Sequence, residues 1–444
     1  MRVHQTAVWL RTLLGEEGDF ATVLRGAGLV VIIRVLASAV GFASVILLAR
    51  WMGSSEYGLY SFAIAWMTLL AYPTTLGLPG AAVRFVAHYA AANDWQHVAG
   101  FMKVSSWLAF GCGALVATLA IGAVLVFKSG LDPAYVAPTI VALAGIPIVA
   151  LTIVRSEAIR GLGWLALAWG PLQLGQPLLL LIVTAIILFI AMQLTATMAV
   201  VASIVAYAAT LIAQWGVLHA RLGTRIRVEP KNQLGPWLGV AASFAWISLA
   251  NVILLQAGVI VVGIFLRPQD VAIYSAAAAT SGLVALPIFA AVALGAPKFA
   301  ALHAQQRRLE LQALFTNIVR LTIWPSLAIA LIFVAFGSTV LRLFGPGFEQ
   351  GYPVLLVLTL GQLVITFVGP VENLLNMTGH HVVTARVQTT SAILAVVFGL
   401  VSTRIWGSVG TAVAFSAAVA LGNAGLTIFV VRKLEIYPSL PVQR

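Results

Sequence analysis

Residues 60–84 read YSFAIAWMTLLAYPTTLGLPGAAVR, and residues 274–298 read YSAAAATSGLVALPIFAAVALGAPK. Each stretch starts with Tyr-Ser, carries a proline 13 residues after the tyrosine (Pro73 and Pro287), and reaches a cation 11 residues after that proline (Arg84 and Lys298). An apolar run that ends in a cation is typical of a membrane helix that reaches a charged membrane face. Because spacing is shared as well as composition, the chain is predicted to contain an internal repeat.

The composition excludes a water-soluble globule. Hydrophobic residues make up 61% of the 444 residues, charged residues only 9%, and the mean hydropathy is +1.03. These values predict an all-α polytopic membrane protein. The net charge of +12 comes from basic residues that stand singly between apolar runs, so it indicates a positive-inside bias and no nucleic-acid partner. Cys112 is the only cysteine, which excludes a disulfide and a cysteine metal cluster.

Twelve apolar segments have the length of roughly 20 residues that a membrane span needs. They lie near residues 26–52, 58–80, 104–127, 135–155, 164–190, 196–219, 238–266, 271–297, 313–340, 354–378, 387–403 and 408–431. An even number of spans in each half predicts a parallel repeat, with two six-helix lobes facing each other. We therefore expect five regions: a cytoplasmic arm at 1–25, an N-lobe at 26–220, a linker at 221–237, a C-lobe at 238–432 and a cytoplasmic tail at 433–444.

The basic residues predict the orientation of these spans. If the N-terminus is cytoplasmic, 18 of the 25 Lys and Arg fall on the cytoplasmic side. Five fall outside: Arg50, Lys128, Arg267, Arg342 and Arg404. This asymmetry predicts a multi-pass membrane protein with both termini in the cytoplasm. Two arginines, Arg34 and Arg320, remain inside predicted spans.

Arg34 is predicted to lie deep in the first span. It follows Arg25 by nine residues, which places it roughly 13 Å further into a hydrocarbon core about 30 Å thick. An arginine at the membrane centre costs roughly 2.5 to 3.5 kcal/mol unless it meets water or a partner. Its helical face carries Ser38, Gly41 and Ser44, so we expect it to point into the bundle. Three roles remain open: a cation that binds an anionic ligand in a cavity, a cation paired with a structural carboxylate or carbonyl, and a side chain that snorkels.

Four further polar residues lie in predicted spans. Arg320 is a candidate second cation on the opposite lobe, with snorkelling as the alternative. Glu372, between Pro370 and Asn373, could bind a coupling proton or cation, or form a salt bridge with Arg34 or Arg320. Asn251 and Gln256 in the seventh span are candidates to line a substrate cavity, or else hydrogen-bonding groups between helices.

Short motifs in both halves carry a family resemblance. The first half contains LARWMG at 48–53, EYGLY at 56–60, LGL at 76–78 and RFVA at 84–87. The second half contains AIYSAA at 272–277, FG at 344–345 and NMTG at 376–379. Together these stretches, over nearly the whole chain, resemble the polysaccharide-transport flippases, the O-antigen and exopolysaccharide exporters of the MATE-like MOP superfamily. Such loose motifs specify the fold better than the substrate.

The resemblance implies a function. Members of this family move undecaprenyl-pyrophosphate-linked oligosaccharides from the cytoplasmic to the periplasmic leaflet by alternating access between two six-helix lobes. A basic residue in the first span is typical of them, and Arg34 stands at that position. The resemblance also implies lipid-linked oligosaccharide and membrane lipids as ligands, and polysaccharide polymerase or export components as candidate partners. The family often has an acid in the seventh span where this chain reads QAGV at 256–259, which puts ion coupling in doubt.

Physical reasoning agrees with the function that the resemblance implies. A pyrophosphate headgroup cannot cross hydrocarbon alone, and a buried guanidinium binds phosphate with two parallel hydrogen bonds. The alternative within the fold is a cation-coupled multidrug or small-molecule exporter, whose lobes should carry carboxylates in place of Arg34. We expect no enzymatic activity, since the 13 acidic residues are scattered singly. We expect no cofactor or metal, although transport could be coupled to a proton or sodium gradient.

Overall fold

The computed structural model describes residues 20–130, 132–226 and 228–437, and within these ranges the chain is helical without strands. Residues 1–19 and 438–444, which belong to the predicted arm and tail, lie outside them. The first half contains α2 (Phe20–Thr74), α3 (Leu78–Ala91), α4 (Trp95–Phe127), η1 (Lys128–Gly130), α5 (Pro133–Ala144), α6 (Ile146–Gly161), α7 (Leu165–Trp169), η2 (Gly170–Gly175), α8 (Gln176–Ala191), α9 (Ala196–Leu222) and η3 (Gly223–Ile226).

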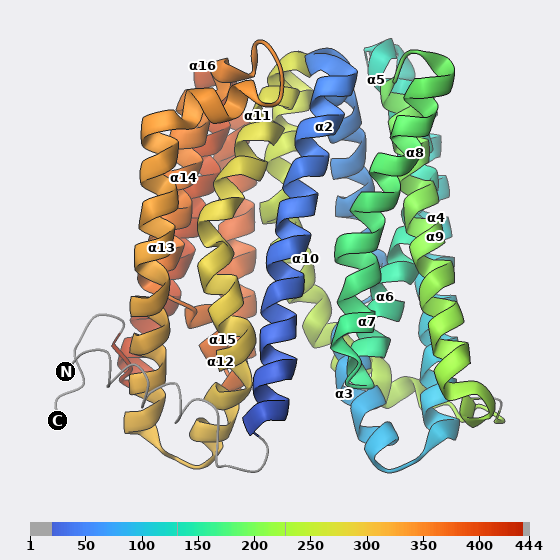
Figure 1. Ribbon diagram of the computed structural model, residues 1–444, viewed down its shortest axis with the longest axis vertical. Helices are drawn as coiled ribbons and strands as arrows, with labels where there is room; N and C mark the ends of the chain where they lie inside the picture. Colours follow the sequence, from blue (N-terminus) through green and yellow to red (C-terminus); the bar gives the residue numbers. More distant parts are fainter. Residues whose placement is uncertain (1–19, 131, 227, 438–444) are drawn as a thin grey trace.

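The second half is built in the same way. It contains α10 (Leu234–Phe265), α11 (Pro268–Ser281), η4 (Gly282–Ala285), α12 (Leu286–Ala304), α13 (Arg308–Arg342), η5 (Phe348–Gly351), α14 (Tyr352–Val368), α15 (Val371–Met377), α16 (His381–Phe429) and η6 (Val430–Leu434). Figure 1 shows the two halves side by side, with α4 to α9 in green and cyan on the right, α13 to α16 in orange and red on the left, and α2 between them.

The described helices make twelve membrane passages, as the sequence predicts. Nine helical segments are long and apolar enough to cross a bilayer, and the bent pair α5–α6 makes a tenth. Two of these segments, in α2 and α16, each cross twice, which brings the number of passages to twelve. At 1.5 Å per residue, the 55 residues of α2 would be more than twice as long as a bilayer core is thick, and α2 turns back at Gly53, where φ is 74°. Likewise α16 turns back at Trp406 and Gly407.

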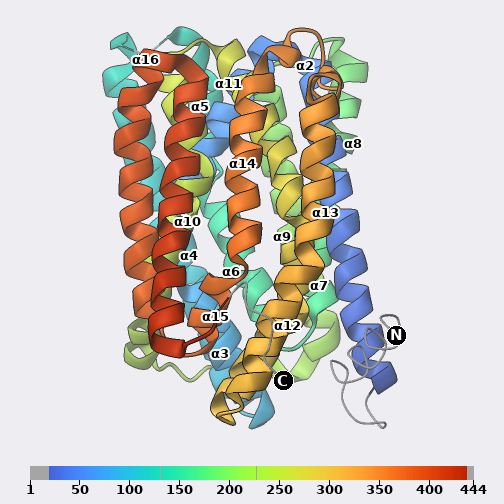
Figure 2. The ribbon, with the colours of Figure 1, turned by 90° about the vertical axis from the view of Figure 1, so that its left-hand side faces the viewer.

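The bundle has two distinct ends. The linker end carries residues 223–226 and 228–233, which connect α9 to α10, together with α3. The distal end carries the turns of α2 at Gly53 and of α16 at Gly407, so both lie opposite the linker end (Figures 1 and 2). Residues equivalent in the repeat occupy equivalent helices. Tyr60 lies in the second half of α2 and Tyr274 lies in α11, and both segments run from the distal end toward the linker end.

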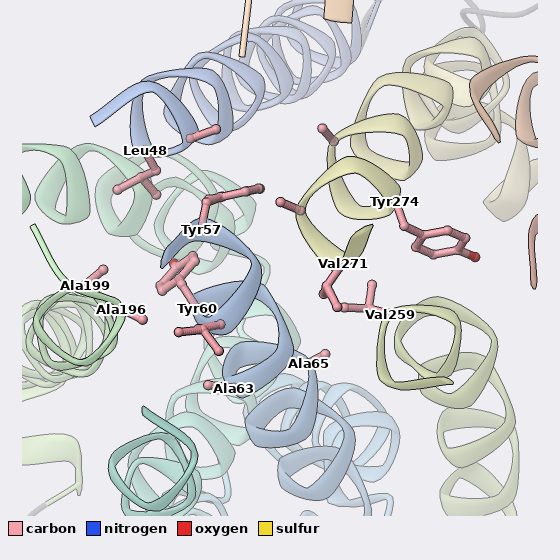
Figure 3. Packing of buried hydrophobic residues seen from close by; sticks show 14 of the residues in the cluster. Leu48, Tyr57, Tyr60, Ala63, Ala65, Ala196, Ala199, Val259, Val271 and Tyr274 are labelled. Atoms are coloured by element: carbon pink, nitrogen blue, oxygen red, sulfur yellow. The ribbon is translucent and has the colours of Figure 1, made fainter. Parts of the chain in front are cut away.

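At the distal end, residues of both halves form one hydrophobic cluster. It joins Leu48 and Tyr57 of α2 to Val271 of α11 and Phe348 of η5. Figure 3 shows Val271 against Val259 of α10, with Tyr60 and Tyr274 on opposite sides of this contact. Tyr60 reaches into the first half, where its hydroxyl lies 3.0 Å from the Ser203 hydroxyl.

The backbones of the two halves also touch at the distal end. A Cβ on Gly58 of α2 would lie only 1.8 Å from the carbonyl oxygen of Pro268, so only glycine fits there. The ring of Phe42 meets that of Phe344 edge to face across the same boundary, with centroids 5.7 Å apart. The distal end is therefore closed.

At the linker end the two halves of the chain form separate hydrophobic clusters. One cluster contains Phe101, Ile159 and Leu218 of the first half, and another contains Phe315 and Leu374 of the second half. Helix α10 is the exception among the described elements, since Trp237 and Ala241 pack into the first cluster.

A chain of hydrogen bonds attaches α10 to the first half. Trp237 Nε1 donates to Tyr89 Oη at 3.1 Å, Tyr89 Oη donates to Gln233 Oε1 at 3.1 Å, and Gln233 Nε2 lies 3.0 Å from His97 Nε2. His97 Nδ1 lies 2.6 Å from Asp94 Oδ2, and this contact lowers the pKa of the Asp94 carboxyl. The lobes are thus joined at the distal end and, at the linker end, mainly through α10.

Candidate functional site

Arg34 lies at the boundary between the two halves. At 1.5 Å per residue it is about 21 Å from Phe20 and about 28 Å from Gly53, near the middle of the first passage. Its side chain is half-buried, and its guanidinium carbon lies 5.4 Å from the ring centroid of Phe289 in α12. This distance is within the range of a cation–π interaction, which links an N-lobe helix to a C-lobe helix.

The face of α2 around Arg34 has free space. Ser38 Oγ donates a hydrogen bond to the Arg34 carbonyl at 2.9 Å, so this hydroxyl binds the backbone and not the guanidinium. A Cβ built on Gly41, two turns along the same face, would meet no atom within 4 Å. None of the ion pairs among the described residues includes Arg34. Of its three predicted roles, a structural carboxylate pair is therefore not observed, and the face has room for a ligand.

Glu372 lies inside the C-lobe, between three helices. It lies in the first turn of α15, directly after the helix interruption at Gly369 (φ 83°) and Pro370. Gln388 Nε2 of α16 donates to Glu372 Oε2 at 2.9 Å, and the Asn251 side chain of α10 hydrogen-bonds the same carboxyl group. The predicted salt bridge with Arg34 or Arg320 is not present in the described part of the chain.

The two candidate residues of the seventh span, Asn251 and Gln256, have different surroundings. Asn251 contacts Glu372, whereas Gln256 is half-buried next to the exposed Leu255. Both lie on α10, the helix that packs on the N-lobe at the linker end. The structure therefore associates Asn251 with the carboxylate and leaves Gln256 as a separate polar group of the same helix.

Arg320 does not join Arg34. Its side chain is exposed on α13, on the face that also carries Leu321 and Trp324, whose exposed fraction is 72%. The buried stripe of α13 contains Ile318, Val319 and Thr322 instead. This placement agrees with the alternative role in which Arg320 snorkels to the membrane interface, and it does not support a second cation for the ligand of Arg34.

Sequence reasoning missed three polar residues inside helices. Gln388 had a weak signal, as an amide within the eleventh span. Glu157 was not recognised as a membrane carboxylate, but it lies in α6 and pairs with Arg160 at 2.5 Å. The signal was their spacing of three residues, which puts both on one helix face. Arg155 was counted as a cytoplasmic charge, but it lies within α6 and donates to Ser106 of α4.

A family model described as "Polysaccharide biosynthesis protein" matches residues 23–303, which is more than half of the chain. The match includes Arg34, Asn251 and Gln256. It ends before Arg320 and Glu372. No curated protein matches the chain at a significant level.

Solved structures of membrane transporters share the fold. A multidrug resistance MATE family transporter of the MOP superfamily in an inward-facing conformation has a TM-score of 0.77 at 16% identity, over 91% of this chain and 98% of that one. A MOP superfamily transporter from Pyrococcus furiosus Vc1 has a TM-score of 0.64 at 14% identity, over 96% and 98%. The lipid II flippase MurJ in an inward closed conformation has a TM-score of 0.68 at 12% identity, over 91% and 87%. The chain therefore has the MATE-like fold of this superfamily.

Proposed function

The chain belongs to the polysaccharide biosynthesis protein family, and from this premise we propose that it is a flippase for lipid-linked oligosaccharides. It moves undecaprenyl-pyrophosphate-linked glycan from the cytoplasmic to the periplasmic leaflet of the inner membrane, for O-antigen or exopolysaccharide assembly. The observation that carries this proposal is Arg34, a membrane-centre cation at the lobe boundary without a carboxylate partner among the described residues.

The chemistry of the substrate fits this residue. A pyrophosphate diester is a dianion, and a guanidinium offers it a planar pair of N–H donors. The aromatic ring of Phe289 holds the cation at the boundary but supplies no negative charge that would compete with phosphate. The site would therefore bind an anion without first breaking an ion pair.

The closed distal end supports a mechanism of alternating access. In this state the lobes meet tightly at Gly58 and Pro268, whereas the hydrophobic clusters of the linker end are separate. A headgroup would reach Arg34 from the linker end. Opening of the distal contact, with closure of the linker end, would then release the headgroup on the other side.

We place the coupling ion at Glu372. Its carboxylate is held by the amides of Asn251 and Gln388 and has no basic partner in the described residues, an arrangement that could take up a proton or a sodium ion. The same residue is the observation that favours the second candidate, a cation-coupled exporter of small molecules. The two differ in Arg34, which attracts a lipid diphosphate and repels an organic cation.

The test of function is a deletion strain analysed by mass spectrometry of its lipid extract. Loss of the protein should accumulate undecaprenyl-pyrophosphate-linked oligosaccharide and remove the surface polysaccharide, and the wild-type gene should reverse both effects. Unchanged lipid-linked intermediates, together with sensitivity to organic cations, would instead favour the multidrug exporter.

The orientation has its own test. We propose that the linker end faces the cytoplasm, with both termini, because the sequence-based topology assigns 18 of the 25 Lys and Arg to that side, or 17 without Arg155. In a Cys112→Ala background, Ser129→Cys at the distal end and Glu229→Cys at the linker end should react with an impermeant thiol reagent from opposite sides. Labelling of both from one side would reverse or break the twelve-passage topology.

A further inference from the structure

The N-lobe has a basic pocket that the transport mechanism does not use. Its volume is about 260 Å³, and it opens between α4, α6 and α9, toward the linker end. Its polar lining consists of Lys103, Ser106, Arg155 and His219. We propose that this pocket binds the phosphate headgroup of an anionic phospholipid in the leaflet at the linker end, which is the cytoplasmic leaflet in the orientation proposed above.

The charges of the pocket match a phosphate. Three of its eight lining residues can carry positive charge, and none of the eight is acidic. None of the ion pairs in the described ranges includes Lys103, Arg155 or His219. Basic pockets between transmembrane helices are typical binding sites of anionic lipid headgroups.

Arg155 is positioned to bind an anion within the membrane. Its Nη2 donates to Ser106 Oγ at 3.1 Å, and Ser106 Oγ itself donates to the Met102 carbonyl at 2.6 Å. This arrangement fixes one edge of the guanidinium. A guanidinium has five N–H donors, and a donor left unpaired away from water costs stability, so the remaining ones favour an acceptor in the pocket.

His219 adds an imidazole ring to the lining of the same pocket. Its Nδ1 lies 3.0 Å from the Trp215 carbonyl oxygen. Because a carbonyl oxygen only accepts hydrogen bonds, Nδ1 carries the proton and Nε2 is the ring nitrogen left for another partner. Protonation of Nε2 would turn it into a donor for phosphate.

The surroundings of the pocket indicate a lipid rather than a soluble anion. Trp107 lines the pocket with an exposed fraction of 68%, and Trp215 next to His219 is 54% exposed, as expected of side chains at a membrane interface. Toward the distal end, α4 and α9 expose large apolar side chains, among them Leu115 and Ile212. These side chains offer a surface for acyl chains directly beyond the headgroup.

The pocket lies away from Arg34. Figure 1 places α4 and α9 at the edge of the bundle farthest from α13 and α14, whereas Arg34 contacts α12 across the lobe boundary. A lipid in this pocket would therefore hold the flank of the N-lobe in the membrane while the lobes move. It would not occupy the site proposed for the transported headgroup.

The test is native mass spectrometry of the full-length, delipidated protein titrated with defined lipids. Phosphatidylglycerol should bind more tightly than zwitterionic phosphatidylcholine of the same chain length. Arg155→Gln and Lys103→Gln should each weaken phosphatidylglycerol binding about tenfold, as loss of one charge-assisted contact predicts. Arg404→Gln, an exposed arginine at the distal end, is the matched control and should bind like the wild type.

Three results would overturn the proposal. One is equal binding of the two phospholipids by the wild-type protein. The second is inorganic phosphate that competes with phosphatidylglycerol at equal concentration, which would indicate a soluble-anion site. The third is a preference for undecaprenyl diphosphate that Arg155→Gln removes, which would indicate a substrate site.

Three controls separate this test from other failures. Arg155→Lys keeps the charge and should retain part of the binding, and the melting temperature of each variant shows whether it folds. Arg34→Ala should bind phosphatidylglycerol like the wild type. The lipid pocket and the transport site can thus fail independently.

Discussion

Arg34 and Glu372 are both charged residues inside the bundle, but the protein surrounds them differently. Arg34 stands at the lobe boundary, where its guanidinium faces the ring of Phe289 from the other lobe and forms no ion pair with a described residue, with open space beside Gly41. Glu372 is enclosed within one lobe, where Asn251 and Gln388 hydrogen-bond its carboxyl group. A cation at the boundary between lobes suits a large anion that arrives and leaves, and a carboxylate held by amides suits a small cation.

The largest effect is expected for Arg34→Ala, which removes the boundary cation. Glycan export should fall about 100-fold, because the lost charge-assisted hydrogen bonds correspond to about 3 kcal/mol. Arg34→Lys should retain a fraction, since it keeps the charge without the planar fork, and Arg34→Glu should behave like the deletion. Surface polysaccharide measured at equal protein level checks this prediction. Export at the wild-type rate by a well-folded Arg34→Ala variant would assign Arg34 to helix packing.

A second variant fills the space beside Arg34 and leaves the charge in place. Gly41→Leu places its side chain in open space, since a Cβ there meets no atom within 4 Å, and we expect it to lower export about tenfold by excluding the headgroup, with a melting temperature close to that of the wild type. Gly41→Ala is the mild control and should export nearly normally. If Gly41→Leu exports at the wild-type rate, the ligand does not use this face of α2.

Gly58→Ala changes a glycine that lies in a tight contact, unlike Gly41, which lies beside open space. Its Cβ would lie 1.8 Å from the Pro268 carbonyl oxygen, so the two lobes would have to move apart at the distal end. We expect this variant to lose thermal stability or to shift toward the open distal state, whereas Gly41→Leu loses transport alone. A melting temperature equal to that of the wild type, with unchanged distances between the lobes, would contradict the tight distal contact.

Glu372→Gln should separate coupling from substrate binding. The amide keeps much of the shape of the carboxyl group but carries no negative charge and takes up no proton, so transport should lose its dependence on the ion gradient and fall about tenfold, with substrate affinity unchanged. Asn251→Ala should give a smaller loss, of about threefold, because it removes one of two hydrogen bonds to the carboxyl group. Gradient-dependent uptake in vesicles measures both. An unchanged gradient dependence in Glu372→Gln would move the coupling site elsewhere.

The smallest effect is expected for Arg320→Gln. Its side chain is exposed on the face of α13 that carries Trp324, so export should stay within about twofold of the wild type, as is usual for exposed positions. Export and expression level, measured together, check this. A loss as large as that of Arg34→Ala would restore Arg320 as a second cation for the substrate.

The order of the passages and the depth of Arg34 could be predicted from the sequence. Both depend on local properties, namely apolar length and distance from the nearest charged face. The family resemblance and the repeat at Tyr60 and Tyr274 pointed to the same two-lobed fold. The direct turns at Gly53 and Gly407 also fit a sequence in which two spans are separated by only a few residues.

The side-chain partners could not be predicted in the same way. Phe289 was one aromatic residue among many in apolar runs, and only tertiary packing shows that it covers Arg34. Asn251, Glu372 and Gln388 meet although they lie on three helices far apart in sequence. Arg320 has polar neighbours one turn away, but the rotation of α13 in the bundle, which sequence spacing does not determine, leaves it on the exposed face.

The most direct test is the affinity of the purified, full-length protein for undecaprenyl diphosphate, measured for the wild type, Arg34→Ala, Arg34→Lys and Arg320→Gln. The account predicts that Arg34→Ala weakens binding at least tenfold, that Arg34→Lys lies between it and the wild type, and that Arg320→Gln binds like the wild type. Equal affinity of the wild type and a correctly folded Arg34→Ala variant would contradict the claim that the boundary cation recognises the diphosphate.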